Sequence, residues 1–364
     1  MDFSKYDPLE DTMYQVMDEN GIIINSDHDN KLSDEKAKQS YEKMLFARQA
    51  DLKAVSFQRQ GRMYTYPPNL GQEAIAVAAG MVIHNEDWLV PAFRELGAYL
   101  AKGMSLKEFF LYFRGHEDSL IFENANNMLP FSVPIASQLL HAVGIGYAIN
   151  YRNEKNKAVF TFVGDGGTSE GDFHEALNFA AVWKVPVVFI VQNNQFAISV
   201  PFKKQTASIN IAVKSAAYGI TGIKVDGNDI FAMYDAVQSS ADYARKGNGP
   251  VLIEALTFRS GAHTTSDDPS KYRTQKEEDE WEKKDPILRM RKYLENKNLW
   301  DKKEEEKLLD QYNLEIDRQF EEAEKYPAGS LNDVFQYQYE KLPDELKRQK
   351  AAYEKFLNWK EGRK

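Results

Sequence analysis

The stretch from Ala158 to Ser199 constrains the fold of this chain more than any other part of it. Its apolar runs predict a buried strand at 158–163, a helix at about 172–183 and a second buried strand at 185–191. A glycine-rich turn follows the first strand, and a polar loop follows the second. Because parallel strands joined by a crossover helix end side by side, the turn and the loop should meet at one sheet edge, where open α/β sheets bind ligands.

Two polar clusters occupy these strand ends. The sequence GDGG at 164–167 opens the turn, and Asn193-Asn194 opens the loop. A carboxylate, an amide carbonyl and a free backbone carbonyl are hard oxygen ligands, and glycines let backbone N–H groups approach an anion closely. Mg²⁺ prefers oxygen ligands and completes its octahedron with water and phosphate oxygens. These residues therefore predict a pocket for Mg²⁺ and a diphosphate.

The composition narrows the class of protein. A chain of 364 residues, 43% of them hydrophobic, can build one large α/β domain or two small ones. The net charge of −9 argues against nucleic-acid binding, which needs a basic surface. No run approaches the ~20 apolar residues of a membrane span, and without cysteine neither disulfides nor thiolate chemistry is possible. The acid-rich first 35 residues resemble neither a signal peptide nor a transit peptide, so a cytoplasmic bacterial protein is expected.

The rest of the chain predicts further strand and helix units. Ser33 is expected to cap a helix whose buried face carries Tyr41, Met44, Leu45, Leu52 and Val55. Further helices are predicted at 106–113, 137–151 and 230–245, and further strands from Asp87, from Gly222 and at 251–258. Each strand with its following helix extends one parallel sheet. The predicted organisation is an N-terminal arm at 1–32, an α/β domain at 33–300 and a helical extension at 301–364.

The spacing of the two polar clusters resembles a known motif. GDG, then residues 167–192, then NN is similar to the thiamine diphosphate motif, and the chain from about Leu32 to Trp300 resembles the α subunit of 2-oxo acid dehydrogenase E1 components, especially of the bacterial pyruvate dehydrogenase type. The resemblance implies a thiamine diphosphate-binding fold and oxidative decarboxylation of pyruvate, with the acyl group passed to a lipoyl group. Branched-chain 2-oxo acid and acetoin dehydrogenases share these motifs and remain alternatives.

The resemblance also implies roles for individual residues. Asp165 and Asn194 would bind Mg²⁺ through their side chains, and Phe196 through its backbone carbonyl. Phe93 and Arg94 match the aromatic-arginine pair of the family, whose planar guanidinium binds the diphosphate. Phe93 lacks the phenol that many relatives have at this position.

The implied site has two further parts. His263 would contact the phosphates and the reacting groups, so it is the candidate catalytic residue, and the backbone near Ile135 would hold the aminopyrimidine ring. The implied cofactor-binding set is Phe93, Arg94, Ile135, Gly164, Asp165, Gly166, Gly167, Asn194, Phe196 and His263. Asn193 is expected to brace the loop.

The resemblance implies partner proteins as well. Thiamine enzymes need a carboxylate against the aminopyrimidine ring, and in this family a separate domain supplies it. The remaining length is too short for a second α/β domain of similar size. The implied partners are therefore an E1 β subunit, in an α₂β₂ heterotetramer, and the lipoyl domain of an E2 acyltransferase. An internal glutamate is the alternative source of the carboxylate.

Two other classes of protein compete with this interpretation. The sequence G-T-S-E-G at 167–171 fits the nucleophile elbow of a serine hydrolase, and Ser169, Asp226 and His263 follow in the order of a triad. However, Ser169 comes six residues after Val163, behind a glycine loop that an elbow does not require. A Mg²⁺-nucleotide binder is disfavoured because the chain has no G-x-x-x-x-G-K-[ST] loop.

Overall fold

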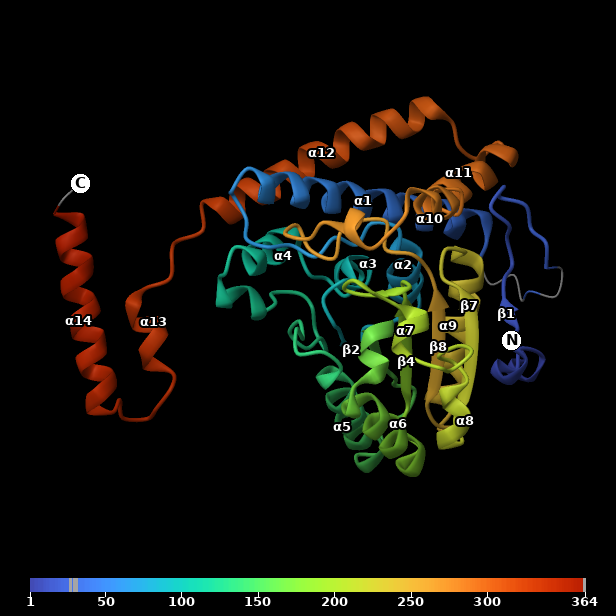
Figure 1. Cartoon of the computed structure of the whole chain (residues 1–364), viewed down its shortest axis with the longest axis horizontal. Helices are drawn as coiled ribbons and strands as arrows, with labels where there is room; N and C mark the ends of the chain where they lie inside the picture. The colour runs from blue at the N-terminus through green and yellow to red at the C-terminus, as the bar shows by residue number, and fades with distance from the viewer. Residues whose placement is uncertain (26–27, 29–31, 363–364) are drawn as a thin grey trace. The chain divides into compact units, whose positions relative to one another are not determined.

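The core of the chain is a parallel sheet whose centre comes from the 158–199 stretch. The computed structural model describes residues 1–25, 28 and 32–362. Within these residues, six strands form one parallel sheet in the order β1-β7-β8-β4-β3-β2 (Figure 1). The strands are β1 (Met13–Tyr14), β2 (Trp88–Val90), β3 (Val159–Gly164), β4 (Val187–Asn193), β7 (Thr221–Asp226) and β8 (Val251–Leu256). The predicted α/β fold with a parallel sheet is confirmed.

The β3-α6-β4 unit places the two polar clusters together. Helix α6 (Gly171–Trp183) connects β3 to β4, and the register pairs Val163 with Val191 and Gly164 with Gln192. Every residue of β4 is buried, as expected for a strand in the interior of a parallel sheet covered by helices on both faces. The GDGG turn and the Asn193-Asn194 loop therefore begin side by side at one sheet edge, as predicted.

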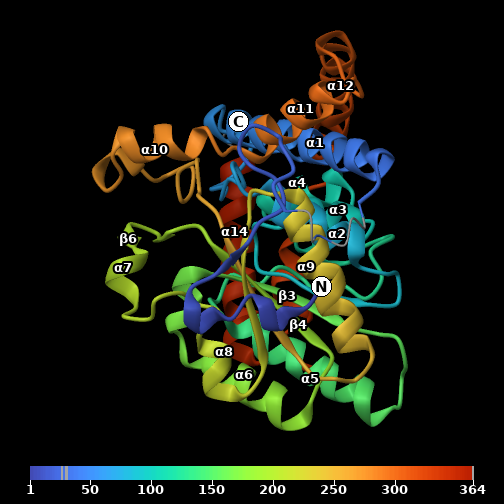
Figure 2. The ribbon, with the colours of Figure 1, turned by 90° about the vertical axis from the view of Figure 1, so that its right-hand side faces the viewer.

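Helices cover both faces of the sheet (Figures 1 and 2). The other helices of the first 324 residues are α1 (Asp34–Arg59), α2 (Glu73–Val82), α3 (Leu96–Ala101), α4 (Leu106–Phe113), α5 (Ser137–Tyr151), α7 (Phe202–Gln205), α8 (Lys214–Tyr218), α9 (Ile230–Arg245), α10 (Gln275–Glu282), α11 (Pro286–Asn296) and α12 (Lys302–Glu324). Helices α5 and α6 share one apolar cluster with Val159, Val163, Val187 and Phe189, which lie on one face. Helix α9 packs on β4, β7 and β8 at the opposite face, and α2 packs on α9.

Helix α1 begins at the predicted cap, but its buried face differs in part from the predicted one. Ser33 caps α1, because its Oγ accepts a hydrogen bond of 3.3 Å from the backbone N–H of Lys36. On the predicted buried face Tyr41, Met44 and Leu45 are buried. The expected burial of Leu52 is wrong, since its side chain is 46% exposed, and Val55 is only partly buried. The buried face of α1 runs instead through small residues such as Ala50 and Ala54, which let the helix pack closely.

The N-terminal arm contributes to the sheet, which the sequence pattern did not indicate. Met13 and Tyr14 pair with Lys224 and Val225 of β7 and form the edge strand β1. The Tyr14 side chain is buried, and its hydroxyl donates to the carboxylate of Asp235 at 2.9 Å. A strand of two residues is too short to show the alternating pattern by which strands are predicted. Contacts with distant segments of the chain hold it in place.

The chain divides into two compact units, Met1–Phe320 and Glu321–Lys364. The second contains α13 (Leu331–Gln336) and α14 (Asp344–Glu361). The boundaries proposed from the sequence stay a prediction. None of the helices in the described residues has both the length and the apolar character that crossing a membrane requires.

Candidate active site

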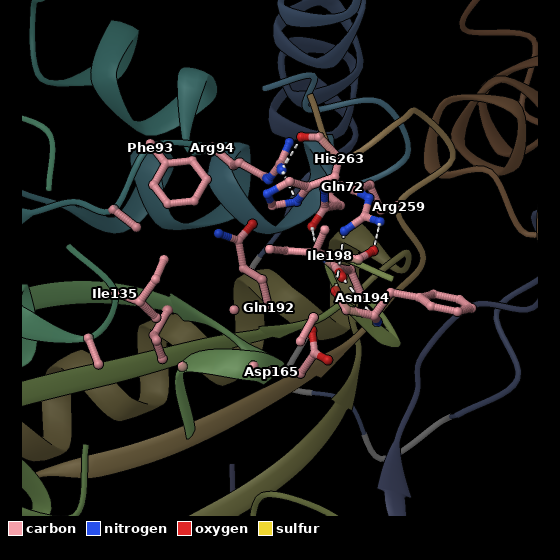
Figure 3. Close-up of a pocket in the computed structure, with 18 of the residues that line it drawn as sticks. Gln72, Phe93, Arg94, Ile135, Asp165, Gln192, Asn194, Ile198, Arg259 and His263 are labelled. Atoms are coloured by element: carbon pink, nitrogen blue, oxygen red, sulfur yellow. Dashed lines mark hydrogen bonds between the residues drawn. The ribbon is translucent and has the colours of Figure 1, made fainter. Parts of the chain in front are cut away.

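A cavity of about 270 Å³ opens at the carboxyl edge of the sheet, where the segments after β2, β3, β4 and β8 converge (Figure 3). Its lining includes all ten residues of the predicted cofactor-binding set, namely Phe93, Arg94, Ile135, Gly164, Asp165, Gly166, Gly167, Asn194, Phe196 and His263. The topology thus brings together residues that are 170 positions apart at the extremes, from 93 to 263. Their roles stay predictions, but their common location is a property of the fold.

Three oxygens face one another in this cavity. The side-chain oxygen Oδ1 of Asn194 lies 3.2 Å from Oδ1 of Asp165 and 3.1 Å from the carbonyl oxygen of Phe196. As hydrogen-bond partners these atoms do not match, because all three are acceptors unless the Asn194 amide turns over. Around a cation they match well, since neighbouring ligands of an Mg²⁺ octahedron with bonds of about 2.0–2.1 Å lie about 2.8–3.0 Å apart.

The Asp165 carboxylate is held in position by neighbours of the turn. Asp165 begins a short 3₁₀ segment, Asp165–Ser169, and is only 1% exposed. Its Oδ2 accepts a hydrogen bond of 2.7 Å from Gln205 Nε2, which leaves Oδ1 directed at Asn194. Burial raises the pKa of this carboxyl to about 6, and the Gln205 hydrogen bond opposes the shift. A cation beside Oδ1 would favour the ionised form.

The glycines of the turn have different reasons to lack a side chain. A Cβ on Gly166 would lie 2.6 Å from the Cβ of Ala197, so close packing excludes one. A Cβ on Gly164 would meet no heavy atom within 4 Å, and Gly164 lines the cavity. The missing side chain at Gly164 therefore leaves open space next to the oxygen cluster.

Arg94 and His263 form a second polar group across the cavity. Nη1 of the buried Arg94 donates to the Pro68 carbonyl at 2.5 Å, and Nη2 lies 3.1 Å from Nδ1 of His263. Burial lowers the pKa of His263 to about 4, and the charges of Arg94 and Arg259 add to the shift. The imidazole is therefore neutral near pH 7. Because Arg94 can only donate, Nδ1 accepts, and the single ring N–H is on Nε2.

Arg259, for which the sequence motifs imply no role, also lines this cavity. It is 1% exposed, and it donates to the carbonyl of Phe196 at 3.2 Å and to the carbonyl of Ile198 at 2.7 Å. Ile198 has a left-handed backbone, with φ of +56°, which is rare for a β-branched residue. Arg259 thus fixes the strained loop that presents the Phe196 carbonyl. Its place three residues beyond the end of β8 was the signal that could have identified it.

Glu95 and Gln192 form a buried pair in the wall of the cavity. Oε1 of Glu95 accepts from Gln192 Nε2 at 2.5 Å, and Oε2 accepts from the Tyr99 hydroxyl at 2.6 Å and from the backbone N–H of Arg94 at 3.2 Å. Burial raises the pKa of Glu95 to about 7. The amide oxygen of Gln192 has no hydrogen-bond partner among the described residues. No pattern in the sequence indicates this pair, apart from its closeness to the two motifs.

Asn193 and Ser169 lie outside the oxygen cluster. The Asn193 amide donates to Glu254 at 2.6 Å, and its oxygen accepts from Gln195 Nε2 at 2.8 Å, which fits a bracing role. The triad of a serine hydrolase is not assembled. His263 Nδ1 faces Arg94, while the other candidate, Asp226, accepts from Arg289 at 2.8 Å.

Comparisons with known proteins identify the family of this chain. A family model described as "Dehydrogenase E1 component" matches residues 41–331. The chain belongs to this family. "Pyruvate dehydrogenase E1 component subunit alpha" of Acholeplasma laidlawii is 44% identical over 342 residues, which cover 93% of this chain and 99% of the relative. The proteins of the same name from Mycoplasma genitalium and Staphylococcus aureus are 41% and 40% identical, over 95% and 94% of this chain and 96% and 92% of their own lengths. The predicted enzyme class, a 2-oxo acid dehydrogenase E1 component, is confirmed.

Proposed function

We propose that this chain is the α subunit of an E1 component that decarboxylates pyruvate with thiamine diphosphate and Mg²⁺. The observation that carries the proposal is the cluster of the Asp165 carboxylate, the Asn194 amide and the Phe196 carbonyl inside the cavity. With the Asn194 oxygen toward the other two groups, the cluster offers three oxygen ligands to a divalent cation. The name of the relatives, pyruvate dehydrogenase, supports the choice of substrate. The three residues would be the protein ligands of Mg²⁺, with phosphate oxygens and water completing the coordination.

The buried guanidinium groups of the cavity suit the diphosphate. Arg94 and Arg259 are both buried, and within the described residues their hydrogen bonds are accepted by carbonyl oxygens, by Nδ1 of His263 and by the Tyr272 hydroxyl rather than by carboxylates. Two guanidinium groups without carboxylate hydrogen bonds leave a positive charge that an anion would balance. The neutral His263 can add one hydrogen bond from Nε2, and the open space at Gly164 lets an anion approach the backbone.

Thiamine diphosphate, when bound, supplies the carbon nucleophile and the electron sink for decarboxylation of a 2-oxo acid. The residues of this chain would orient the cofactor and keep its diphosphate in a site of low water content. Among them Glu95 could in principle supply the carboxylate needed by the aminopyrimidine ring. Both of its oxygens, however, already accept hydrogen bonds from Tyr99, Gln192 and the backbone of Arg94. This supports a β subunit as the source of the carboxylate.

The rim of the cavity also supports a covering partner. Val133 is 56% exposed, Ile135 49% and Ile198 56%, and such apolar side chains around a charged pocket are typical of a protein interface. We therefore include an E1 β subunit, in an α₂β₂ assembly, and the lipoyl domain of an E2 acyltransferase, which would accept the acyl group, in the proposal.

The proposal is tested by coexpressing the chain with the β subunit and assaying decarboxylation of a series of 2-oxo acids. We expect activity that depends on both subunits, on thiamine diphosphate and on Mg²⁺, with pyruvate as the best substrate. A preference for branched 2-oxo acids would instead identify the chain as the α subunit of a branched-chain 2-oxo acid dehydrogenase E1 component. Full activity of this chain alone would contradict the role of the β subunit.

A further inference from the structure

The side-chain amide of Asn194 has two possible orientations with opposite consequences for a cation. In the orientation of the structure, Oδ1 faces Asp165 Oδ1 and the Phe196 carbonyl, and Nδ2 donates to Oε1 of Gln72 at 3.1 Å (Figure 3). After a turn of the amide, the NH₂ group would donate to Asp165 at 3.2 Å and to Phe196 at 3.1 Å. Those two hydrogens would then point to the position where a cation would bind.

Gln72 sets the orientation of the Asn194 amide, because it is the hydrogen-bond partner of the amide atom that points away from Asp165 and Phe196. If Gln72 presents Oε1, Asn194 must present its NH₂ group to Gln72 and its oxygen to the cavity. If Gln72 presents Nε2, the Asn194 oxygen turns toward Gln72 and the NH₂ group turns into the oxygen cluster. The two amides can therefore only turn together.

Without a cation, the orientation of the Asn194 and Gln72 amides found in the structure is unfavourable in free energy. Nε2 of Gln72 is buried and has no hydrogen-bond partner among the described residues, and three acceptors face one another around Asn194. Turning both amides would replace the contacts among the three acceptors by hydrogen bonds and would pair Gln72 Nε2 with Asn194 Oδ1, although Gln72 Oε1 would then give up its own partner. A divalent cation at the oxygen cluster reverses this preference, since it binds the three oxygens that otherwise repel one another.

The backbone that carries Gln72 is anchored, so the residue as a whole cannot shift away from Asn194. Gln72 is 1% exposed and directly precedes α2, and its N–H donates to the Asn69 carbonyl at 3.1 Å. The preceding Gly71 has φ of +92°, and a Cβ there would lie 2.7 Å from the carbonyl of Phe258. Thr257, just beyond β8, donates to the Gly71 carbonyl at 3.2 Å. The turn is thus anchored to the sheet edge that carries the site.

We infer that Gln72 is a positioning residue for the cation site: its amide oxygen holds the Asn194 amide with Oδ1 toward the cavity. This inference rests on the proposed function, because it assumes that Asn194 binds the cation. It adds to that proposal a residue that would not touch the cation and would control its affinity through one hydrogen bond.

The test measures Mn²⁺ affinity of the full chain assembled with its β subunit, in the presence of thiamine diphosphate, by the electron paramagnetic resonance signal of free Mn²⁺. We expect Gln72→Leu to weaken Mn²⁺ binding about tenfold, because the Asn194 amide is then free to turn and donate to Asp165 and Phe196. Gln72→Glu should keep or increase the affinity, because a carboxylate can only accept from Asn194. Circular dichroism and melting curves check that each variant is folded.

An Asn194→Asp background separates positioning from a general structural role. A carboxylate has no orientation to set, so the effect of Gln72→Leu should shrink to less than about twofold in that background. An unchanged affinity of Gln72→Leu, an equal loss in both backgrounds, or a loss of about tenfold or more in Gln72→Glu would overturn the inference and leave the proposed function intact. Failure of the wild-type assembly to bind Mn²⁺ would overturn both.

Discussion

Replacing Glu95 by glutamine should stabilise the chain at alkaline pH and not at acidic pH. Burial raises the pKa of the Glu95 carboxyl from its usual 4.5 to about 7. Between these two values the folded chain holds a proton that the unfolded chain has released. The stability of the folded chain therefore decreases as the pH rises from about 4.5 to about 7. Above pH 7 the loss of stability caused by this carboxylate stays constant.

The size of the effect follows from the pKa shift. One pKa unit corresponds to about 1.4 kcal/mol, so the ionised carboxylate costs up to roughly 3 kcal/mol at pH 8. Glutamine keeps the acceptor for Tyr99 and the N–H of Arg94. Gln192 now donates to Glu95 through Nε2, so its amide must turn in the variant and accept from the new NH₂ group through the oxygen that has no partner among the described residues. The variant thus loses the charge without losing the hydrogen-bond network.

Melting curves of the wild type and of Glu95→Gln from pH 5 to pH 8 test this reasoning. We expect nearly equal melting temperatures at pH 5 and a higher melting temperature of the variant at pH 8. Glu117→Gln removes an exposed carboxylate and is the matched control, for which no such pH-dependent difference is expected. A variant that is less stable than the wild type at pH 8, or a difference that does not change with pH, would refute the argument.

Three further substitutions test the proposed site. Asp165→Ala should abolish the thermal stabilisation by thiamine diphosphate with Mg²⁺, because the only carboxylate of the oxygen cluster is lost; a retained shift would contradict its role as a ligand. Arg259→Lys should weaken thiamine diphosphate binding about tenfold in calorimetric titration, because lysine cannot hold both the Phe196 and the Ile198 carbonyls as guanidinium does; unchanged affinity would refute this. Ser169→Ala should leave turnover of 2-oxo acids at the wild-type level, whereas loss of activity would restore the hydrolase alternative.

Strong local patterns made much of the fold predictable from the sequence. The predicted helices at 137–151 and 230–245 have the same bounds as α5 and α9. The strands β3 and β4 were predictable because continuous apolar runs of this length suit the interior of a parallel sheet. Their connection by one helix then placed Asp165 and Asn194 at the same edge.

The parts that the sequence did not predict depend on contacts between distant segments. Gln72 reaches Asn194 from the segment before α2, and no local pattern connects the two positions. The burial of Glu95 and the pairing of β1 with β7 likewise arise only when separate segments pack together. Arg259, in contrast, could have been predicted from the sequence. It lies just after β8, and residues at the carboxyl ends of parallel strands are candidates for ligand binding, as for Asp165.

The most direct test of the account is anomalous diffraction from crystals of the assembled protein grown with Mn²⁺ and thiamine diphosphate. We expect one Mn²⁺ peak within bonding distance of Asp165 Oδ1, Asn194 Oδ1 and the carbonyl oxygen of Phe196, with the diphosphate between this ion and Arg94. A peak bound elsewhere, or thiamine diphosphate in the cavity with no ion at these three oxygens, would contradict it.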